Sequence, residues 1–338
     1  METVNRLNYI GSKFQLLNWI QENITLKTGI NDFKNIKIGD LFAGTGIVSY
    51  HFRNLGSQIT SNDSELYSSI ITESFVCSNF TLKLKNIIQE LNLSIDLKNG
   101  FITRNFSPFE NCERMYWTIK NAQRIDYFRN QIENYNLSKS EYIFLLASLL
   151  VSADRVANVS AVYGSYLKAF KNTANKDLIL KPIHENNTPS HVDSKVTQKD
   201  VITGEFDKMD IVYLDPPYNE RQYSKNYFPL NIIAMKPDEA VKQNLRGKTG
   251  IPENSFVSSF CQKKNVKNSF EELFKNIDST WIFMSYSSES LITKDEMLTI
   301  MGKFGKADCV EREYKRFKAA NYTHDETIIE YLFSLQKL

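Results

Sequence analysis

The stretch IKIGDLFAGTG, residues 36–46, predicts how this chain folds. Its first half is an apolar run typical of a short buried strand, and the glycines at 44 and 46 end that strand in a turn before a helical stretch at 47–55. A second short strand at 58–62 and a helix at 65–80 follow. This alternation indicates an α/β fold with a parallel sheet and helices on both faces.

The rest of the chain divides into an inserted module and the remainder of the sheet. Amphipathic stretches at 115–135 and 139–151 predict a mainly helical insertion over 82–190, so that 1–81 and 191–338 form the other domain. Strands resume at 196–202, 209–215 and 281–287. Two β-rich runs at 309–317 and 326–335, separated by a polar loop at 318–325, predict a C-terminal antiparallel hairpin at the sheet edge.

Composition excludes several classes of protein. The 338 residues are 42% hydrophobic and 24% charged, which is typical of a folded globular chain rather than a disordered or coiled-coil one. Net charge is only +2, so any nucleic-acid surface must be local. The four cysteines form no CxxC pair, and the longest apolar run, 142–151, is shorter than the ~20 residues that span a bilayer. We therefore expect a cytoplasmic protein with no metal site and no membrane association.

Two acidic residues lie at the ends of the first two predicted strands. The glycine turn lets main-chain N–H groups approach a ligand closely, and Asp40 before it favours a cationic ligand over a phosphate. Asp63 stands 17 residues after Gly46, where a Rossmann-type sheet places the acid that binds a ribose diol. The alternative for this second position is a helix N-cap at Asn62, Asp63 or Ser64.

The tetrapeptide Asp215-Pro-Pro-Tyr218 directly follows the apolar run IVYL. Its prolines stiffen the chain just past the carboxyl end of a strand, where open α/β sheets bind ligands. The Asp215 carboxylate and the Pro216 carbonyl can each accept one hydrogen from an NH2 group, and the Tyr218 ring can stack on a planar base. These groups together predict a holder for an exocyclic amine.

In order and content, these motifs resemble the S-adenosylmethionine-dependent N6-adenine DNA methyltransferases of the Dam-like, alpha group. NYIGSK at 8–13 resembles the N-terminal cofactor motif of that group, and Asp200-Val201 resembles the pair that holds the cofactor adenine. The tract DPPYNERQYSKNYF at 215–228 is most similar to methylases of type II restriction systems, including type IIS ones. Val201 stands where members of this group often have Phe, and Tyr9 stands where some have Trp.

The resemblance implies a Rossmann-like methyltransferase fold and methyl transfer from S-adenosylmethionine to N6 of an adenine flipped out of double-stranded DNA. It implies catalytic roles for Asp215, Pro216, Pro217 and Tyr218. The residues expected to hold the cofactor are Tyr9, Lys13, Asp40, Phe42, Ala43, Gly44, Thr45, Gly46, Asp63, Asp200, Val201 and Asp215. A cognate restriction endonuclease is the expected functional partner.

DNA contacts are predicted from local basic and aromatic segments, chiefly 165–176, 242–267 and the loop at 219–227. The candidate DNA-binding residues are Arg155, Tyr166, Lys168, Lys171, Arg221, Tyr223 and Lys248, with Asn158 and Tyr163 as further candidates in the inserted module. The inserted module is expected to recognise the target sequence. N4-cytosine methylation, RNA or protein-amide methylation, and a non-catalytic role remain open as alternatives at this stage.

Overall fold

The computed structural model describes residues 4–185, 193–315 and 327–338, and of residues 314 and 315 the backbone only. The loop predicted at 318–325 lies outside the described residues. The described part forms two compact units. The sheet unit comprises 11–64, 193–222, 256–315 and 327–338, and the helical unit comprises 4–10, 65–185 and 223–255.

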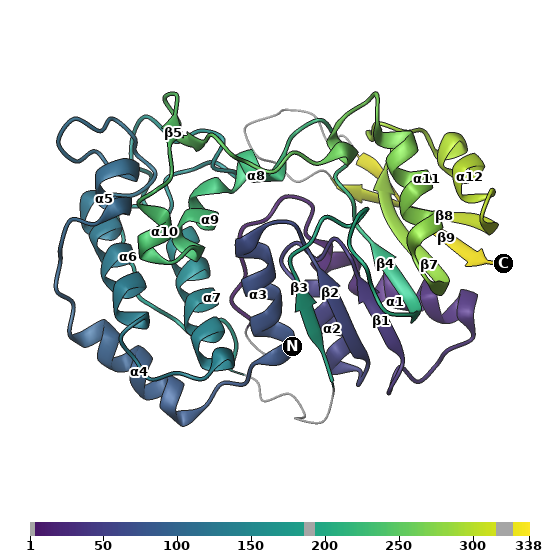
Figure 1. Ribbon diagram of the computed structural model, residues 1–338, viewed down its shortest axis with the longest axis horizontal. Helices are drawn as coiled ribbons and strands as arrows, with labels where there is room; N and C mark the ends of the chain where they lie inside the picture. The colour runs from purple at the N-terminus through teal and green to yellow at the C-terminus, as the bar shows by residue number, and fades with distance from the viewer. Residues whose placement is uncertain (1–3, 186–192, 316–326) are drawn as a thin grey trace. The chain divides into compact units, whose positions relative to one another are not determined.

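The sheet unit contains a seven-stranded sheet in the order β3-β2-β1-β4-β7-β9-β8 (Figure 1). Its strands are β1 (Lys37–Asp40), β2 (Gln58–Asn62), β3 (Lys195–Thr197), β4 (Met209–Leu214), β7 (Ser279–Ser287), β8 (Gly305–Lys315) and β9 (Thr327–Lys337). The first five strands of this order pair in parallel. Their arrangement confirms the predicted Rossmann-like sheet, in which the order of the strands reverses between the parallel neighbours β1 and β4.

The C-terminal strands form the predicted antiparallel hairpin. β9 pairs antiparallel with both β7 and β8, so the last strand of the chain lies inside the sheet and β8 forms its edge. The hairpin therefore places residue 330, in the first half of β9, opposite Ser287 at the carboxyl end of β7.

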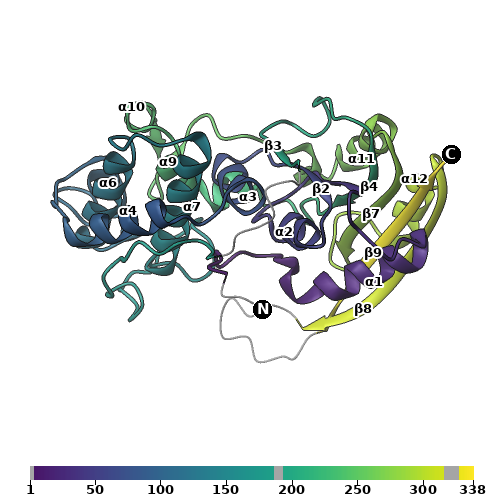
Figure 2. The same cartoon turned by 90° about the horizontal axis from the view of Figure 1, so that it is seen from below.

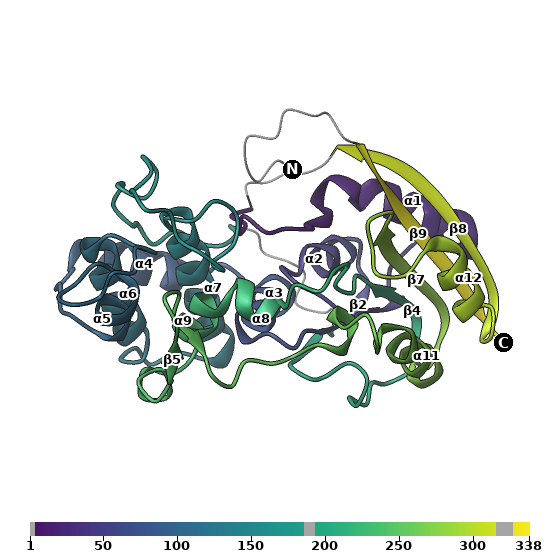
Figure 3. The ribbon, with the colours of Figure 1, turned by 90° about the horizontal axis from the view of Figure 1, so that it is seen from above.

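Helices cover both faces of this sheet. They are η1 (Lys13–Leu16), α1 (Leu17–Thr28), α2 (Ile47–Asn54), η2 (Ser259–Cys261), α11 (Val266–Asn276) and α12 (Lys294–Met301). Lys27 of α1 pairs with Asp308, whereas Lys294 of α12 pairs with Glu311 at 2.5 Å. Because side chains alternate along a strand, residues 308 and 311 of β8 point to opposite faces. Figures 2 and 3 accordingly show α1 and α2 on one face and α11 and α12 on the other.

The core under α11 and α12 explains why these two helices form. Phe270 and Phe274 of α11 and Met297 of α12 are fully buried against alternate residues of the central strands, such as Val212 and Ile282. The first turn of α12 is closed by a capping box between Thr293 and Glu296.

The helical unit consists of helices connected by long segments, together with a small two-stranded hairpin. Its elements are α3 (Leu66–Cys77), α4 (Leu82–Leu93), α5 (Phe101–Phe106), α6 (Ile119–Ile132), α7 (Lys139–Arg155), α8 (Tyr223–Asn226), α9 (Phe228–Ala234), α10 (Pro237–Ala240), β5 (Leu245–Arg246) and β6 (Ile251–Pro252). Every residue of α7 from 143 to 153 is buried, so α7 is the core helix of this unit. No helix in the described ranges has the length and apolar character that a membrane span requires.

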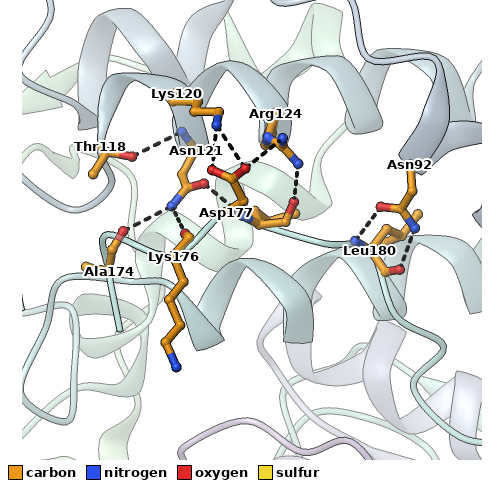
Figure 4. Close-up of polar contacts among 10 residues, drawn as sticks. Asn92, Thr118, Lys120, Asn121, Arg124, Ala174, Lys176, Asp177 and Leu180 are labelled. Carbon is orange, nitrogen blue, oxygen red and sulfur yellow. Dashed lines mark hydrogen bonds and ion pairs between the residues drawn. The ribbon is translucent and has the colours of Figure 1, made fainter. Parts of the chain in front are cut away.

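Asparagine side chains bind the backbone of an extended segment of the helical unit that belongs to no helix or strand (Figure 4). Asn121 of α6 donates to the carbonyls of Ala174 and Lys176 at 3.1 and 2.8 Å and accepts from the Leu178 amide at 2.9 Å. Asn92 of α4 both donates to and accepts from the Leu180 backbone at 2.9 Å. These amides satisfy backbone groups that would otherwise be buried without partners.

Candidate active site

Asp40, at the end of β1, links the sheet to the following helix. Its carboxylate accepts hydrogen bonds from the backbone amide of Ser49 at 3.1 Å and from the Ser49 hydroxyl at 2.7 Å. Burial raises the pKa of Asp40 to about 7; the Ser49 bonds oppose this shift, while the charges of Asp215 and Asp63 add to it. The first strand thus ends in a carboxyl group that burial and two neighbouring acids shift toward its neutral form.

The glycine turn brings the two predicted acids together. Gly44 and Gly46 have φ angles of 53° and 71°, in the left-handed region that glycine adopts without strain. The amide of Gly44 donates to the Asp63 carboxylate at 2.8 Å, although the two residues are 19 positions apart. Asp63 therefore lies at the rim of the turn, as its spacing predicts. Ala43 and Thr45 within the turn are buried.

Asn62, beside Asp63, holds the end of β3 against the end of β2. Its side chain donates to the Lys199 carbonyl and accepts from the Lys199 amide, both at 3.0 Å. Asp200 then begins a turn in which its carboxylate accepts from the Ile202 amide at 2.8 Å. Asn62 was expected as a helix cap or beside a ribose-binding acid, and its contacts with Lys199 could not be foreseen because that residue lies more than 130 positions away in the sequence.

Val201 and Phe42 belong to one apolar cluster of the sheet unit. Val201 is buried, and Phe42 is partly buried with its ring edge-on to Phe260 at 5.1 Å between centroids. The loop after β1 and the loop after β3 therefore offer apolar side chains at the same end of the sheet.

Asp215 and Lys13 form a partly buried ion pair after β4. The Lys13 ammonium lies 2.9 Å from the Asp215 carboxylate, and only 22% of the Asp215 side chain is exposed. Pro216 is buried and Pro217 half-buried, so the stiffened segment lies against the protein. Lys13 was expected to hold the cofactor, and in this structure its ammonium contacts the Asp215 carboxylate directly.

Tyr218 is held by Glu330, a residue that the sequence analysis missed. Its hydroxyl donates to the Glu330 carboxylate at 2.8 Å, and the Lys13 ammonium lies over its ring at 4.9 Å from the centroid. Glu330 also lies 3.5 Å from that ammonium. The signal that could have identified Glu330 is an acidic residue at a position of a β-rich run that faces the protein interior. Acidic side chains are rarely buried without a partner, so a buried acid in a strand indicates a special role.

The electrostatics of this cluster follow from its burial. Burial opposes the charge on Lys13, but the carboxylates of Asp215 and Glu330 outweigh that effect and raise the pKa of Lys13. Burial also raises the pKa of Asp215, against the opposing effect of the Lys13 ammonium. The pKa of Glu330 is raised for the same reason. The two carboxyl groups are thus shifted toward their neutral forms, and a cationic ligand bound next to them would stabilise their ionised forms.

The donors and acceptors at this edge fit S-adenosylmethionine. Burial and the charges of Asp215 and Asp63 raise the pKa of Asp40, and burial raises the pKa of Asp215. A sulfonium and an ammonium group nearby would favour the ionised forms of both carboxyl groups. The left-handed turn allows a ligand to approach the backbone, and Phe42 and Val201 supply apolar surface for a purine. Among the described residues there is no group of three His, Cys, Asp or Glu side chains that could hold a metal ion.

In the helical unit, predicted cofactor and DNA residues meet in an aromatic group. The ring of Tyr9 stacks on Tyr227 at 5.0 Å between centroids, and Tyr223 stacks on the same ring at 6.2 Å. The Tyr227 hydroxyl accepts from the Ile10 amide at 3.0 Å. Tyr227 is fully buried and organises the two predicted residues around it.

A cavity of about 420 Å³ in the helical unit brings together two predicted DNA residues, Tyr166 and Lys248. Arg104 and Arg114 line the same cavity, with Glu110 among its acidic residues. The Arg114 guanidinium donates to the carbonyls of Lys248 and Gly247 at 3.1 Å, in the turn between β5 and β6, and to Asn105 at 3.0 Å. Arg114, which sequence reasoning missed, therefore fixes the hairpin that carries Lys248.

The other predicted DNA residues differ in exposure. Lys168 and Arg221 are exposed. The ammonium of Lys171 donates to the Val159 carbonyl at 2.6 Å, and Arg155 donates to the side chain of Asn5.

Asn158 and Tyr163, the further candidates, are fully buried. Asn158 donates to the carbonyls of Met115 and Leu167 at 3.0 Å, and the Tyr163 hydroxyl donates to Asp154 at 2.7 Å. In this structure both residues organise loops of the helical unit.

Comparison with known proteins gives a family match over most of the chain. The model of the D12 class N6 adenine-specific DNA methyltransferases matches residues 9–300. The Type II methyltransferase M.CviAII of Paramecium bursaria Chlorella virus 1 is 43% identical over 98% of each chain. The Type II methyltransferase M.NlaIII of Neisseria lactamica is 38% identical over 98% of this chain and 99% of its own. The Type II methyltransferase M.FokI of Planomicrobium okeanokoites is 34% identical over 98% of this chain and 53% of its own.

Proposed function

Because this chain belongs to the D12 class N6 adenine-specific DNA methyltransferases, we propose that Asp215 and the Pro216 carbonyl hold the N6 amino group of the target adenine during methyl transfer. The methyl donor is S-adenosylmethionine, which supplies a methyl group on a cationic sulfur. The observation that carries the proposal is the buried ion pair of Lys13 with Asp215 directly beside the Tyr218 ring.

Asp215 has two tasks at the amine. The N6 lone pair of adenine is delocalised into the ring, and two acceptors that bind both amino hydrogens favour the pyramidal, nucleophilic nitrogen. As positive charge develops on N6, the Asp215 carboxylate stabilises it, and the surplus proton leaves to water. Lys13 favours the ionised form of Asp215, the form that stabilises this charge, against the effect of burial.

The cofactor is held at the same edge of the sheet. Asp40 faces its cationic end, Asp63 accepts from the ribose hydroxyls, and the backbone of the turn from Gly44 to Gly46 lets it approach closely. Phe42 and Val201 flank its adenine. Ala43, Thr45, Lys13, Tyr9 and Asp200 complete the proposed set of cofactor residues.

The target adenine leaves the duplex and stacks on Tyr218. Its amine is inaccessible inside a base pair, so the base must be flipped out, at a cost of a few kcal/mol. The Tyr218 ring has a fixed orientation because its hydroxyl is bound by Glu330. One face of this ring is turned to the Lys13 ammonium, so the base stacks on the opposite face.

The helical unit supplies contacts with DNA that offset the cost of flipping. Support comes from the cavity that joins Tyr166 and Lys248 with Arg104, since cations and an aromatic ring around one cavity suit a phosphate and its sugar. We assign sequence recognition to the module at 82–190, together with the β5–β6 hairpin. Arg221 and Tyr223 in the loop after the tetrapeptide contact the DNA around the flipped base.

The protein acts as the modification component of a type II restriction-modification system. Support comes from the relatives named Type II methyltransferase, which match nearly the whole chain. A restriction endonuclease with the same recognition sequence is its functional partner.

The test is expression in a host that lacks adenine methylation, followed by modification-sensitive sequencing of the host genome. The expected result is N6-methyladenine at every copy of one short sequence, which also identifies the recognition site. Methylation of cytosine, or of adenine without regard to sequence, would contradict the proposal. Challenge of the methylated DNA with an endonuclease of that specificity tests the protective role.

A further inference from the structure

The geometry points to Glu330 as a positioning residue for methyl transfer, which fixes the Tyr218 ring and shares the Lys13 ammonium with Asp215. This inference rests on the roles proposed above for Asp215 and Tyr218. Glu330 does not belong to any of the sequence motifs from which the site was predicted, and it lies 112 residues beyond Tyr218 in the chain.

Three oxygen acceptors surround the Lys13 ammonium. Its nitrogen lies 3.0 Å from the Gly11 carbonyl, 2.9 Å from the Asp215 carboxylate and 3.5 Å from the Glu330 carboxylate. An ammonium group has three donors and no acceptor, so this set defines where Lys13 lies. Without the Glu330 carboxylate, the ammonium would bind Asp215 more closely and neutralise it more completely.

The same carboxylate orients Tyr218. Its contact at 2.8 Å holds the hydroxyl end of the ring, while the Tyr286 ring lies at right angles to the Tyr218 ring at 5.2 Å between centroids. The Leu291 amide donates to the Tyr218 carbonyl at 3.1 Å and holds the backbone. Because its hydroxyl and its backbone are both held, the Tyr218 ring keeps one orientation for stacking with the flipped base.

Glu330 also sets the charge of the site. Asp215, Glu330 and Lys13 together carry one net negative charge when all three are ionised. Because positive charge develops on N6 during the reaction, a net negative cluster stabilises the transition state more than a neutral pair does. Glu330 thus keeps the cluster net negative, while Lys13 favours the ionised form of Asp215.

Other charged and titratable groups around Glu330 stay in place when it is replaced. Arg312 of β8 is its cross-strand neighbour, with the guanidinium over Trp19 at 6.0 Å. Asp40 and Tyr213 interact electrostatically with Asp215 from β1 and β4. A change in pH dependence on replacing residue 330 is therefore attributable to the loss of its own charge.

The decisive variant is Glu330→Gln, compared with wild type in the full-length protein with S-adenosylmethionine and a duplex containing the recognition sequence. The single-turnover rate is expected to fall about 10- to 100-fold, less than the ~10²- to 10³-fold loss on removing a direct hydrogen-bond partner of a transition state. KM for the cofactor should change by less than about threefold. The acid limb of the pH–rate profile should move to lower pH, because Lys13 then acts on Asp215 alone and lowers its pKa.

Two conservative variants separate charge from position. Glu330→Asp restores the charge and should recover part of the rate. Tyr218→Phe removes only the hydroxyl that Glu330 binds and keeps the ring and both carboxyl groups. Its rate should fall about 3- to 10-fold, and the fluorescence of 2-aminopurine at the target position should differ from that with wild type. In the double variant, the losses should be less than additive, since both changes break the same contact.

Glu311→Gln is the matched control, because it neutralises an exposed carboxylate on the adjacent strand β8. Its rate and pH profile should equal those of wild type. The inference would be overturned if the Glu330→Gln protein had the rate and the acid limb of wild type. If Glu330→Gln does not fold, a wild-type rate in Tyr218→Phe would overturn it instead. Failure of the proposed function is distinct: it would appear as an active Asp215→Ala protein.

Discussion

The charged groups proposed for catalysis in the sheet unit and those proposed for DNA contact in the helical unit differ in burial. In the sheet unit, Lys13, Asp215 and Glu330 are buried or nearly so and bind one another. In the helical unit, the predicted DNA residues Lys168 and Lys248 are exposed, and the buried guanidinium of Arg129 holds the carbonyls of Ile233 and Met235 at 3.0 Å.

The difference suits what each unit is proposed to bind. A methyl transfer needs groups fixed to within a fraction of an ångström, and buried mutual contacts provide that. A DNA backbone is recognised by mobile cations that release counterions, so exposure suits them. We therefore expect substitutions in the sheet unit to change rate or cofactor affinity steeply, and substitutions in the helical unit to change DNA affinity in smaller steps.

The largest effect is expected for Asp215→Ala. The variant loses an acceptor for the N6 amine and the negative charge beside it, so the single-turnover rate should fall by about 1,000-fold or more. Cofactor affinity, measured by calorimetry, should change by less than about tenfold. A rate near that of wild type would remove the role assigned to Asp215.

Asp40→Asn should weaken cofactor binding by about 10- to 100-fold, the effect of losing a charged partner worth ~1.5–3 kcal/mol. In wild type, Asp40 with its pKa of about 7 is protonated below that pH in the free protein. A cationic ligand must displace this proton, so affinity should rise with pH up to about 7 and then level off. Calorimetry in buffers of different ionisation enthalpy should show proton release that Asp40→Asn abolishes. A wild-type affinity that is flat from pH 5.5 to 8 would contradict this.

Arg114→Ala should weaken DNA binding about tenfold, or ~1.4 kcal/mol, without changing cofactor affinity, because it frees the turn that carries Lys248. Arg124→Ala is the matched control, since Arg124 holds a loop of the same unit by donating to the Leu178 carbonyl at 2.8 Å (Figure 4). Both variants should lower Tm by about 2 °C. Equal losses of DNA affinity in the two would show that Arg114 acts only through stability.

The smallest effect is expected for Lys248→Ala. One phosphate contact should be lost, so DNA affinity should fall about three- to fivefold at moderate salt, and the slope of log Kd against log salt should decrease by about 1. Lys85→Ala, at an exposed position of α4 outside the cavity, should leave both quantities unchanged. A salt slope identical to that of wild type would remove Lys248 from the DNA surface.

Several features of the fold and site could be predicted because they are local. An apolar strand followed by a glycine turn and a helix is a short-range pattern, and the predicted strand at 58–62 matches β2 to the residue. The Asp63 position next to Gly44 follows from the usual geometry of a parallel strand–helix–strand unit. The two prolines after β4 stiffen the chain wherever they occur.

Other features could not be predicted, because they depend on contacts between distant segments. Asn62 binds Lys199, and Arg114 binds Lys248, in each case across more than 130 residues. Nothing in the sequence near Asn158 or Tyr163 indicates that the structure buries them completely.

The sequence by itself determined the alternation of strands and helices, the order of the motifs, and the pair of acceptors at Asp215 and Pro216. Only the tertiary structure decided that Glu330 would join them, since β9 enters the sheet beside β7 and brings a carboxylate from near the chain's end to the Tyr218 hydroxyl. The physical reason is that a residue's neighbours along the chain set its backbone conformation, whereas its burial and charge partners are set by which strands pair.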